Sequence, residues 1–131
     1  MRERIDDERG ATAVEFAFIV PLLIVLVLGI AEFGHAFQVQ GTLSAAAREG
    51  VRAMALQNDQ GAAIAAVQDA ASSLDPAVTA AHITITPDVC PTTGGGTTNV
   101  RLTIDYPMPY LTGFFGSSLT LNGTGVMRCN G

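Results

Sequence analysis

Few side chains in this sequence have the chemistry of a reactive site. The chain contains only two His and two Cys, and two Cys are too few for the four-Cys cluster of a structural zinc site. Glu32 and His35 have the i, i+3 spacing of the Glu-x-x-His pairs in di-iron bundles, but such a centre needs a second copy and further carboxylates. We therefore expect an interfacial polar pair there, no metal and no cofactor. Because no nucleophile–base pair is evident either, the sequence does not predict an enzyme.

The other notable acid, Glu15, lies at the start of a long apolar run. Residues 16–31 carry no charge, and residues 11–31 carry only Glu15. About twenty helical residues cross a hydrocarbon core of ~30 Å, so this segment is long enough to span a membrane. An acid there costs up to roughly 2.5–3.5 kcal/mol. Glu15 therefore either reaches to the interface or meets a cation in the membrane, such as a newly exposed α-amino group.

Composition and charge agree with a membrane-linked structural protein. Of 131 residues, 48% are hydrophobic and 15% are charged, against about 25% charged in ordinary soluble proteins. The net charge is −5 and the cations form no basic stripe, which argues against nucleic acid as a partner. Arg2, Arg4 and Arg9 precede the apolar run and favour a cytoplasmic N-terminus with the C-terminal part outside.

The residues around Glu15 resemble a known processing site. Residues 9–16, RGATAVEF, resemble the cleavage site of type IV prepilin-like proteins. Over residues 10–56 the chain is similar to the TadE-like family, the minor pseudopilins of the tight-adherence (Tad) pilus. The similarity includes Glu15-Phe16 and residues 21–23, 29–34 and 46–52. It implies that a prepilin peptidase cuts between Gly10 and Ala11 on the cytoplasmic side, which makes Glu15 the fifth residue of the mature chain.

The resemblance also implies a role and partners. The protein would be a minor pilin that initiates, caps or primes a Tad-type pilus or secretion filament. Its partners would be the prepilin peptidase, other pilins, the inner-membrane assembly platform and membrane lipid. In the filament, the Glu15 carboxylate of one subunit would pair with the Ala11 amine of a neighbour and favour correct axial register.

Small residues recur along the helix that we expect to continue past the membrane. They are Gly29, Gly34, Gly41 and Ala45. Small side chains let helices approach closely, and glycine costs up to ~1 kcal/mol in a helix interior, so we expect these positions to pack against other subunits. An Ala-rich helix of good propensity explains Ala45 equally well. The expected organisation is a leader (1–10), a transmembrane segment (11–31), its periplasmic continuation (32–57) and a small C-terminal domain (58–131).

The C-terminal domain is expected to be α+β. A short amphipathic helix is predicted at residues 62–74, followed by strands at 82–86, 99–106 and 119–128 in a small antiparallel sheet. Gly123 and Gly125 suggest a bulge in the last strand. The apolar connection at residues 107–115 either covers one end of this core or touches the membrane surface or a partner.

Two cysteines stand at the two ends of this predicted sheet. If Cys90 and Cys129 pair, they close a loop of about forty residues, with a chain-entropy gain of ~4 kcal/mol. A disulfide persists in an oxidising compartment, in agreement with a C-terminal part outside the cytoplasm. Two unpaired buried thiols are the alternative.

A second hypothesis assigns a different leader. Gly34-His35-Ala36 resembles the small-x-small pattern before a signal-peptidase cut. A cut after Ala36 would release a secreted binding module that begins at Phe37. The mixed charge of the first nine residues and Glu15 argue against it.

Overall fold

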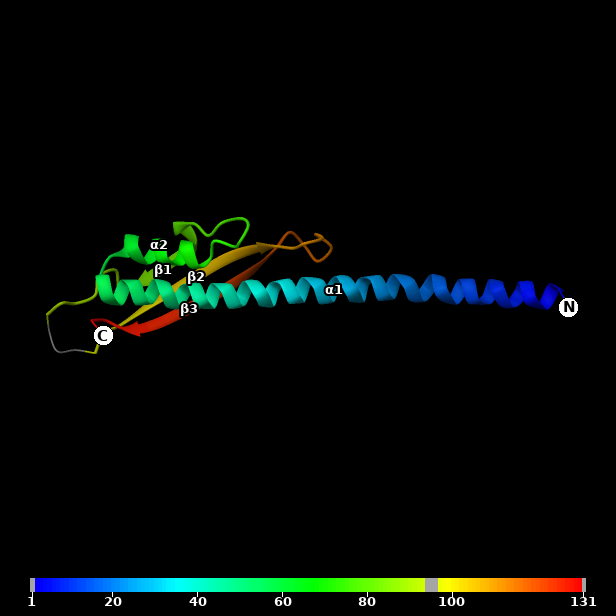
Figure 1. The fold of residues 1–131 in the computed structure, drawn as a ribbon, viewed down its shortest axis with the longest axis horizontal. Helices are drawn as coiled ribbons and strands as arrows, with labels where there is room; N and C mark the ends of the chain where they lie inside the picture. The colour runs from blue at the N-terminus through cyan, green and yellow to red at the C-terminus, as the bar shows by residue number, and fades with distance from the viewer. Residues whose placement is uncertain (1, 94–96, 131) are drawn as a thin grey trace. The chain divides into compact units, whose positions relative to one another are not determined.

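The chain folds as the α+β protein that the sequence predicts. The computed structural model describes residues 2–93 and 97–130, with side chains from residue 7 onward. The elements are α1 (Arg2–Gln57), α2 (Gln60–Ala70), the short 3₁₀ helix η1 (Ala80–His82), β1 (Ile83–Thr86), β2 (Asn99–Pro109) and β3 (Ser118–Arg128) (Figure 1). Residues 1–34 and 35–131 form two compact units.

The first unit is the N-terminal part of α1. Pro21 lies inside the helix, where the missing N–H and the ring would disfavour a helix in water. A membrane helix tolerates proline better. The large apolar side chains of this unit are exposed, among them Phe16 at 66% and Phe18 at 78%.

The junction between α1 and α2 is built by two consecutive polar residues. Asn58 has a φ of 51°, a left-handed conformation that asparagine adopts more readily than most residues, and its N–H donates to the Met54 carbonyl at 2.9 Å. The Asp59 carboxylate then caps α2 by accepting from the Gly61 N–H at 2.8 Å. The two helices, expected to be separated by residues 58–61, are therefore separated by only two residues.

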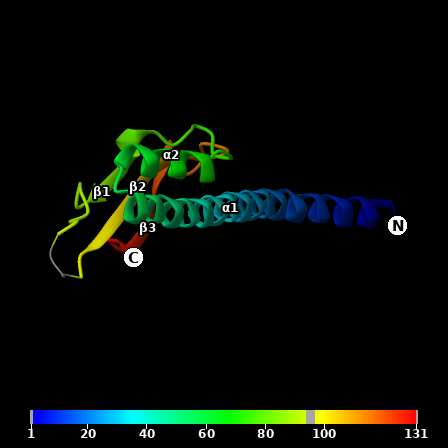
Figure 2. The same cartoon turned by 60° about the vertical axis from the view of Figure 1, so that its left-hand side comes forward.

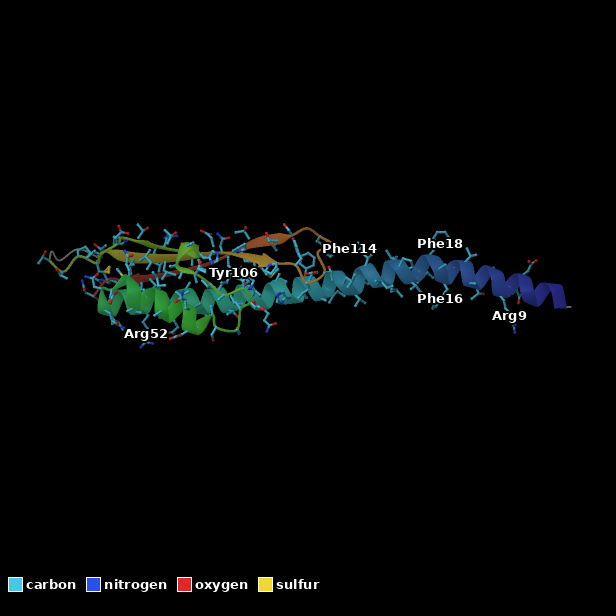
Figure 3. The ribbon with its side chains drawn as sticks, turned by 90° about the horizontal axis from the view of Figure 1, so that it is seen from above. Arg9, Phe16, Phe18, Arg52, Tyr106 and Phe114 are labelled. Carbon is cyan, nitrogen blue, oxygen red and sulfur yellow. A yellow bond between two sulfur atoms is a disulfide. The ribbon has the colours of Figure 1, made fainter. Side chains whose placement is uncertain are left out.

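The second unit has two layers. Its sheet is antiparallel in the order β1-β2-β3. The C-terminal part of α1 and α2 lie side by side on one face of this sheet (Figures 2 and 3). Along β2, Val100, Leu102 and Ile104 are fully buried while the residues between them are exposed or half-buried. This alternation matches the period of two that the sequence shows, and it fixes which face receives the helices.

One detail of the predicted sheet is wrong. The pairing of β2 with β3 runs without interruption from Asn99↔Arg128 to Pro109↔Ser118, so β3 has no bulge at Gly123 and Gly125. Both strands also extend further than expected, because Met108 is buried (1% exposed) and continues the inner face of β2.

Tyr106 anchors the loop before η1 to the sheet. Its side chain is 1% exposed, and its hydroxyl donates to the Pro76 carbonyl at 2.6 Å. Its ring meets His82 edge-on, with centroids 6.0 Å apart. Burial raises the pKa of the Tyr106 hydroxyl above its ordinary value of 10.0, and the nearby Asp75 carboxylate raises it further.

The raised pKa of Tyr106 predicts a loss of stability at high pH. The folded chain holds this proton more tightly than the unfolded chain, so the free energy of unfolding should fall as the pH rises above about 10. Tyr106→Phe should lack this component. It should also cost about 1 kcal/mol at neutral pH, because the hydrogen bond to Pro76 is lost. Urea unfolding at several pH values checks this, and equal pH slopes for the two proteins would contradict it.

Candidate functional site

The residues predicted to take part in processing all lie on α1. Gly10 and Ala11 are exposed and helical, and a side chain at Gly10 would meet nothing within 4 Å. Glu15 follows one turn after Ala11 and is also exposed. The Thr12 hydroxyl donates to the Glu8 carbonyl at 2.8 Å, so the helix in this region keeps its ordinary local bonding. These positions are accessible to another protein.

The apolar part of α1 has the composition of a membrane segment. Among the residues that the structure describes, one helix is long and apolar enough to cross a membrane, and none of that apolar stretch is buried within the chain. Leu22, Leu26 and Ile30 are 70%, 57% and 64% exposed. Phe16 and Phe18 project from the helix in different directions (Figure 3). Apolar side chains exposed around the whole helix, rather than on one stripe, need an apolar surrounding on all sides.

The described structure leaves space beside the glycines that are predicted to pack against neighbours. A side chain at Gly29, Gly34 or Gly41 would meet nothing within 4 Å among the described residues, and Ala45 is exposed. The fold of the chain itself therefore does not require small residues there.

The polar residues of α1 do not gather into a reactive centre. Glu32 is buried at 4% exposure and His35 is half-buried. Among the described residues, no group of three or more His, Cys, Asp or Glu side chains could hold a metal ion. Arg48, Glu49 and Arg52 are exposed.

Sequence reasoning missed the packing role of three glycines in the second unit, two of which it had assigned to a bulge. A methyl group at Gly123 would lie 2.5 Å from the Leu43 carbonyl oxygen, and one at Gly125 would lie 2.6 Å from that of Ala47. A methyl group at Gly50 would collide with Val67 of α2 and lie 2.7 Å from Leu102 of β2. The cost of glycine in a helix interior is the signal that could have singled out Gly50.

The disulfide ties the end of the sheet to the end of α1. Cys90 and Cys129 are bonded, with a sequence separation of 39. The Asn58 side chain accepts from the Cys90 N–H at 2.6 Å and donates to the Cys90 carbonyl at 3.1 Å. The Asn130 N–H donates to the Ala55 carbonyl at 3.2 Å. Both cysteines are thus held beside the last turn of α1.

The order of elements is an apolar N-terminal helix followed by a small disulfide-bonded α+β unit. Comparison with known proteins gives the family. Residues 10–52 match the model of the TadE-like protein family. This family is one of structural pilus components and is not a known enzyme family. No curated protein and no solved structure matches the chain.

The close approach of β3 to α1 predicts a sharp difference between two glycines. Gly125→Ala should lower the free energy of unfolding by about 1–3 kcal/mol, because the added methyl group meets helix backbone that cannot move aside. Gly41→Ala is the control. Gly41 lies on α1, the helix that Gly125 contacts, but in open space, so this change should stabilise the monomer by up to ~1 kcal/mol. Denaturant unfolding of both variants measures this. Equal effects would show that contact with β3 does not determine the choice of glycine.

Proposed function

We propose that this protein is a minor pilin that takes part in assembly of a Tad-type pilus after removal of its leader by a prepilin peptidase. The observation that carries the proposal is that the family match begins at Gly10 and includes the apolar stretch of α1, which is not buried within the described chain. The matched segment thus includes the proposed processing site and the helix surface that would meet other subunits.

The surroundings of Gly10 support cleavage after this residue. The position is exposed and no side chain crowds it. A peptidase binds its substrate in extended form, so the helix must open locally. Glycine lowers the cost of that opening by up to ~1 kcal/mol relative to alanine. Cleavage would remove the charged residues 1–10 and leave an α-amino group on Ala11.

The new amine would give Glu15 a partner in the membrane. Within one subunit the two groups belong to the same helix, whereas in a filament the amine of one subunit can reach Glu15 of the next. A carboxylate paired with an ammonium group in low dielectric is strongly attracted, and either charge alone is costly there. This difference would favour one axial stagger between subunits over the others.

The small residues would form the subunit contacts of the helix. Gly29, Gly34, Gly41 and Ala45 are not needed for packing within the chain, yet three of them are glycines that weaken a helix. Close approach to helices of neighbouring pilins offsets this cost, because contact at small residues brings helix backbones together.

The proposed location is the inner membrane, with the N-terminus in the cytoplasm and the second unit outside. The three arginines before the apolar stretch support this orientation, and so does the disulfide in the second unit. The partners proposed on this basis are the prepilin peptidase, other pilins and the inner-membrane assembly platform.

Leader removal can be tested by mass and N-terminal sequence. Membrane-fraction protein should begin at Ala11 when a prepilin peptidase is co-expressed, and at Met1 when it is not. Gly10→Leu should abolish this cut because the bulky side chain opposes entry into the protease site, whereas Ala13→Leu serves as the matched control and should be cut. A soluble chain that begins at Phe37 would instead support a signal peptide and overturn the proposal.

The proposed charge pair can be tested with Glu15→Gln. This change leaves the amine of the neighbour without its counter-ion, so we expect more than about a tenfold loss of assembled pili. Leader removal and the stability of the second unit should stay unchanged. Glu49→Gln, an exposed acid further along α1, is the matched control and should assemble normally. Wild-type amounts of pili from Glu15→Gln would exclude the pairing.

A further inference from the structure

The hairpin between β2 and β3 carries an exposed apolar tip, which we define as residues 110–117. Leu111, Phe114 and Phe115 of this tip are 59%, 73% and 48% exposed. The Phe115 ring lies 6.3 Å from that of Tyr110 and 6.4 Å from that of Phe114 between centroids, so the three aromatic rings form one cluster. These three side chains therefore do not cover the end of the core, which was one of the two roles expected for the connection at residues 107–115.

The tip has a defined conformation of its own. The Phe114 N–H donates to the Thr112 hydroxyl at 3.3 Å, and the Gly116 N–H donates to the Gly113 carbonyl at 3.4 Å. Gly113 and Gly116 have φ angles of 70° and 127°, conformations that glycine adopts most easily. The turn therefore presents its aromatic side chains outward.

The tip is also far from any charge in the sequence. No Asp, Glu, Lys or Arg occurs between Asp105 and Arg128. Such an uncharged aromatic surface favours an apolar or interfacial surrounding over water. It offers no basic group for the phosphates of nucleic acid or of anionic lipids.

The register of β3 on α1 shows at which end of the second unit the tip lies. Gly123 lies beside Leu43 and Gly125 beside Ala47, so both elements run in the same direction. Two strand residues and four helix residues each span about 6 Å. The beginning of β3, and the tip before it, therefore lie toward the end of this unit at which α1 enters.

The distances along the two elements agree with this placement. Ser118 precedes Gly123 by about 16 Å of strand, and His35 precedes Leu43 by about 12 Å of helix. The tip is thus at the level of His35 or beyond it, within the second unit. Figure 3 shows Phe114 and Arg52 toward opposite ends of this unit.

The chain enters the second unit at His35, only four residues after the uncharged run 16–31 ends. Four helical residues span about 6 Å, which is comparable to the depth of a headgroup layer. If the apolar run occupies the hydrocarbon core, His35 on the same continuous helix therefore lies at the depth of the headgroups. Aromatic side chains are enriched at this depth of a membrane.

From these observations we infer that the 110–117 tip is a membrane-surface anchor, whose aromatic cluster inserts into the headgroup–acyl boundary of the bilayer that the helix spans. The ligand is the bilayer interface itself and not a particular anionic headgroup, because the tip has no cation. The inference depends on membrane anchoring by α1 and not on leader cleavage or pilus assembly. Anchoring at a second point would restrict the tilt of the second unit before assembly.

The absence of tryptophan from the chain permits a direct test. The full-length Phe114→Trp variant is reconstituted in phosphatidylcholine–phosphatidylethanolamine vesicles, with lipids brominated near the headgroup end of the acyl chains as quencher. Val126→Trp is the matched control, at an exposed position (52%) on β3 of the same sheet. Flotation of the vesicles establishes that both variants are anchored.

We expect the tryptophan of Phe114→Trp to emit at shorter wavelength and to be quenched several-fold more strongly by brominated lipid than that of Val126→Trp. Aqueous acrylamide should show the reverse order, and added salt should change neither. Equal acrylamide quenching of the two variants would overturn the inference. The inference would also be overturned if the Phe114→Trp fluorescence were shielded from both brominated lipid and acrylamide, and only at a high protein-to-lipid ratio. That result would show that the tip contacts another copy of the protein instead of the bilayer. Chains lost from the vesicles on flotation would overturn the anchoring itself.

Discussion

The constraint on which this protein depends is that most large apolar side chains described in the first unit are exposed. Large residues such as Phe18 and Leu22 are mostly exposed, and each would cost of the order of 1.5–3 kcal/mol if left in water. A surrounding of lipid or of other apolar helices removes this cost. The TadE-like family match extends over the same stretch, and the proposed pilin role would supply such a surrounding.

The second unit satisfies the opposite requirement, because it must fold around the same helix in water. It does so by bringing the helix and sheet backbones close together at small residues, and not by filling the space between them with large side chains. Gly50, Gly123 and Gly125 remove the side chains that would separate α1 from α2 and from the sheet, and Ala46 and Ala47 are fully buried on the same helix face. The disulfide and the two asparagines Asn58 and Asn130 fasten the far end of this packing. A small unit gains much from such fastening.

The glycines of α1 and β3 therefore serve two different purposes. Gly50, Gly123 and Gly125 pack closely against other parts of the second unit. Gly34 and Gly41 are on open helix surface and remain available for other subunits in the proposed filament. The distinction matters for variants, since one class of substitution acts on folding and the other would act on assembly.

The sequence by itself determined the elements with a strong local signal. An uncharged run of sixteen residues and the alternation of Val100, Leu102 and Ile104 are periodic patterns that identify a membrane-type helix and a half-buried strand without further knowledge. The family resemblance likewise rested on a contiguous string around Gly10 and Glu15, which no tertiary contact modifies.

Only the tertiary structure decided what depends on pairs of residues distant in the sequence. Gly125 suggested a bulge because a glycine in a strand has that local meaning, but the contact with Ala47 gives it another role. The end of β2 likewise extended to Pro109, because Met108 reaches the core. The position of the 110–117 tip, at the end of the second unit that begins with His35, followed from the register of β3 on α1. In each case the local pattern allowed several conformations, and the contact across the fold selected one.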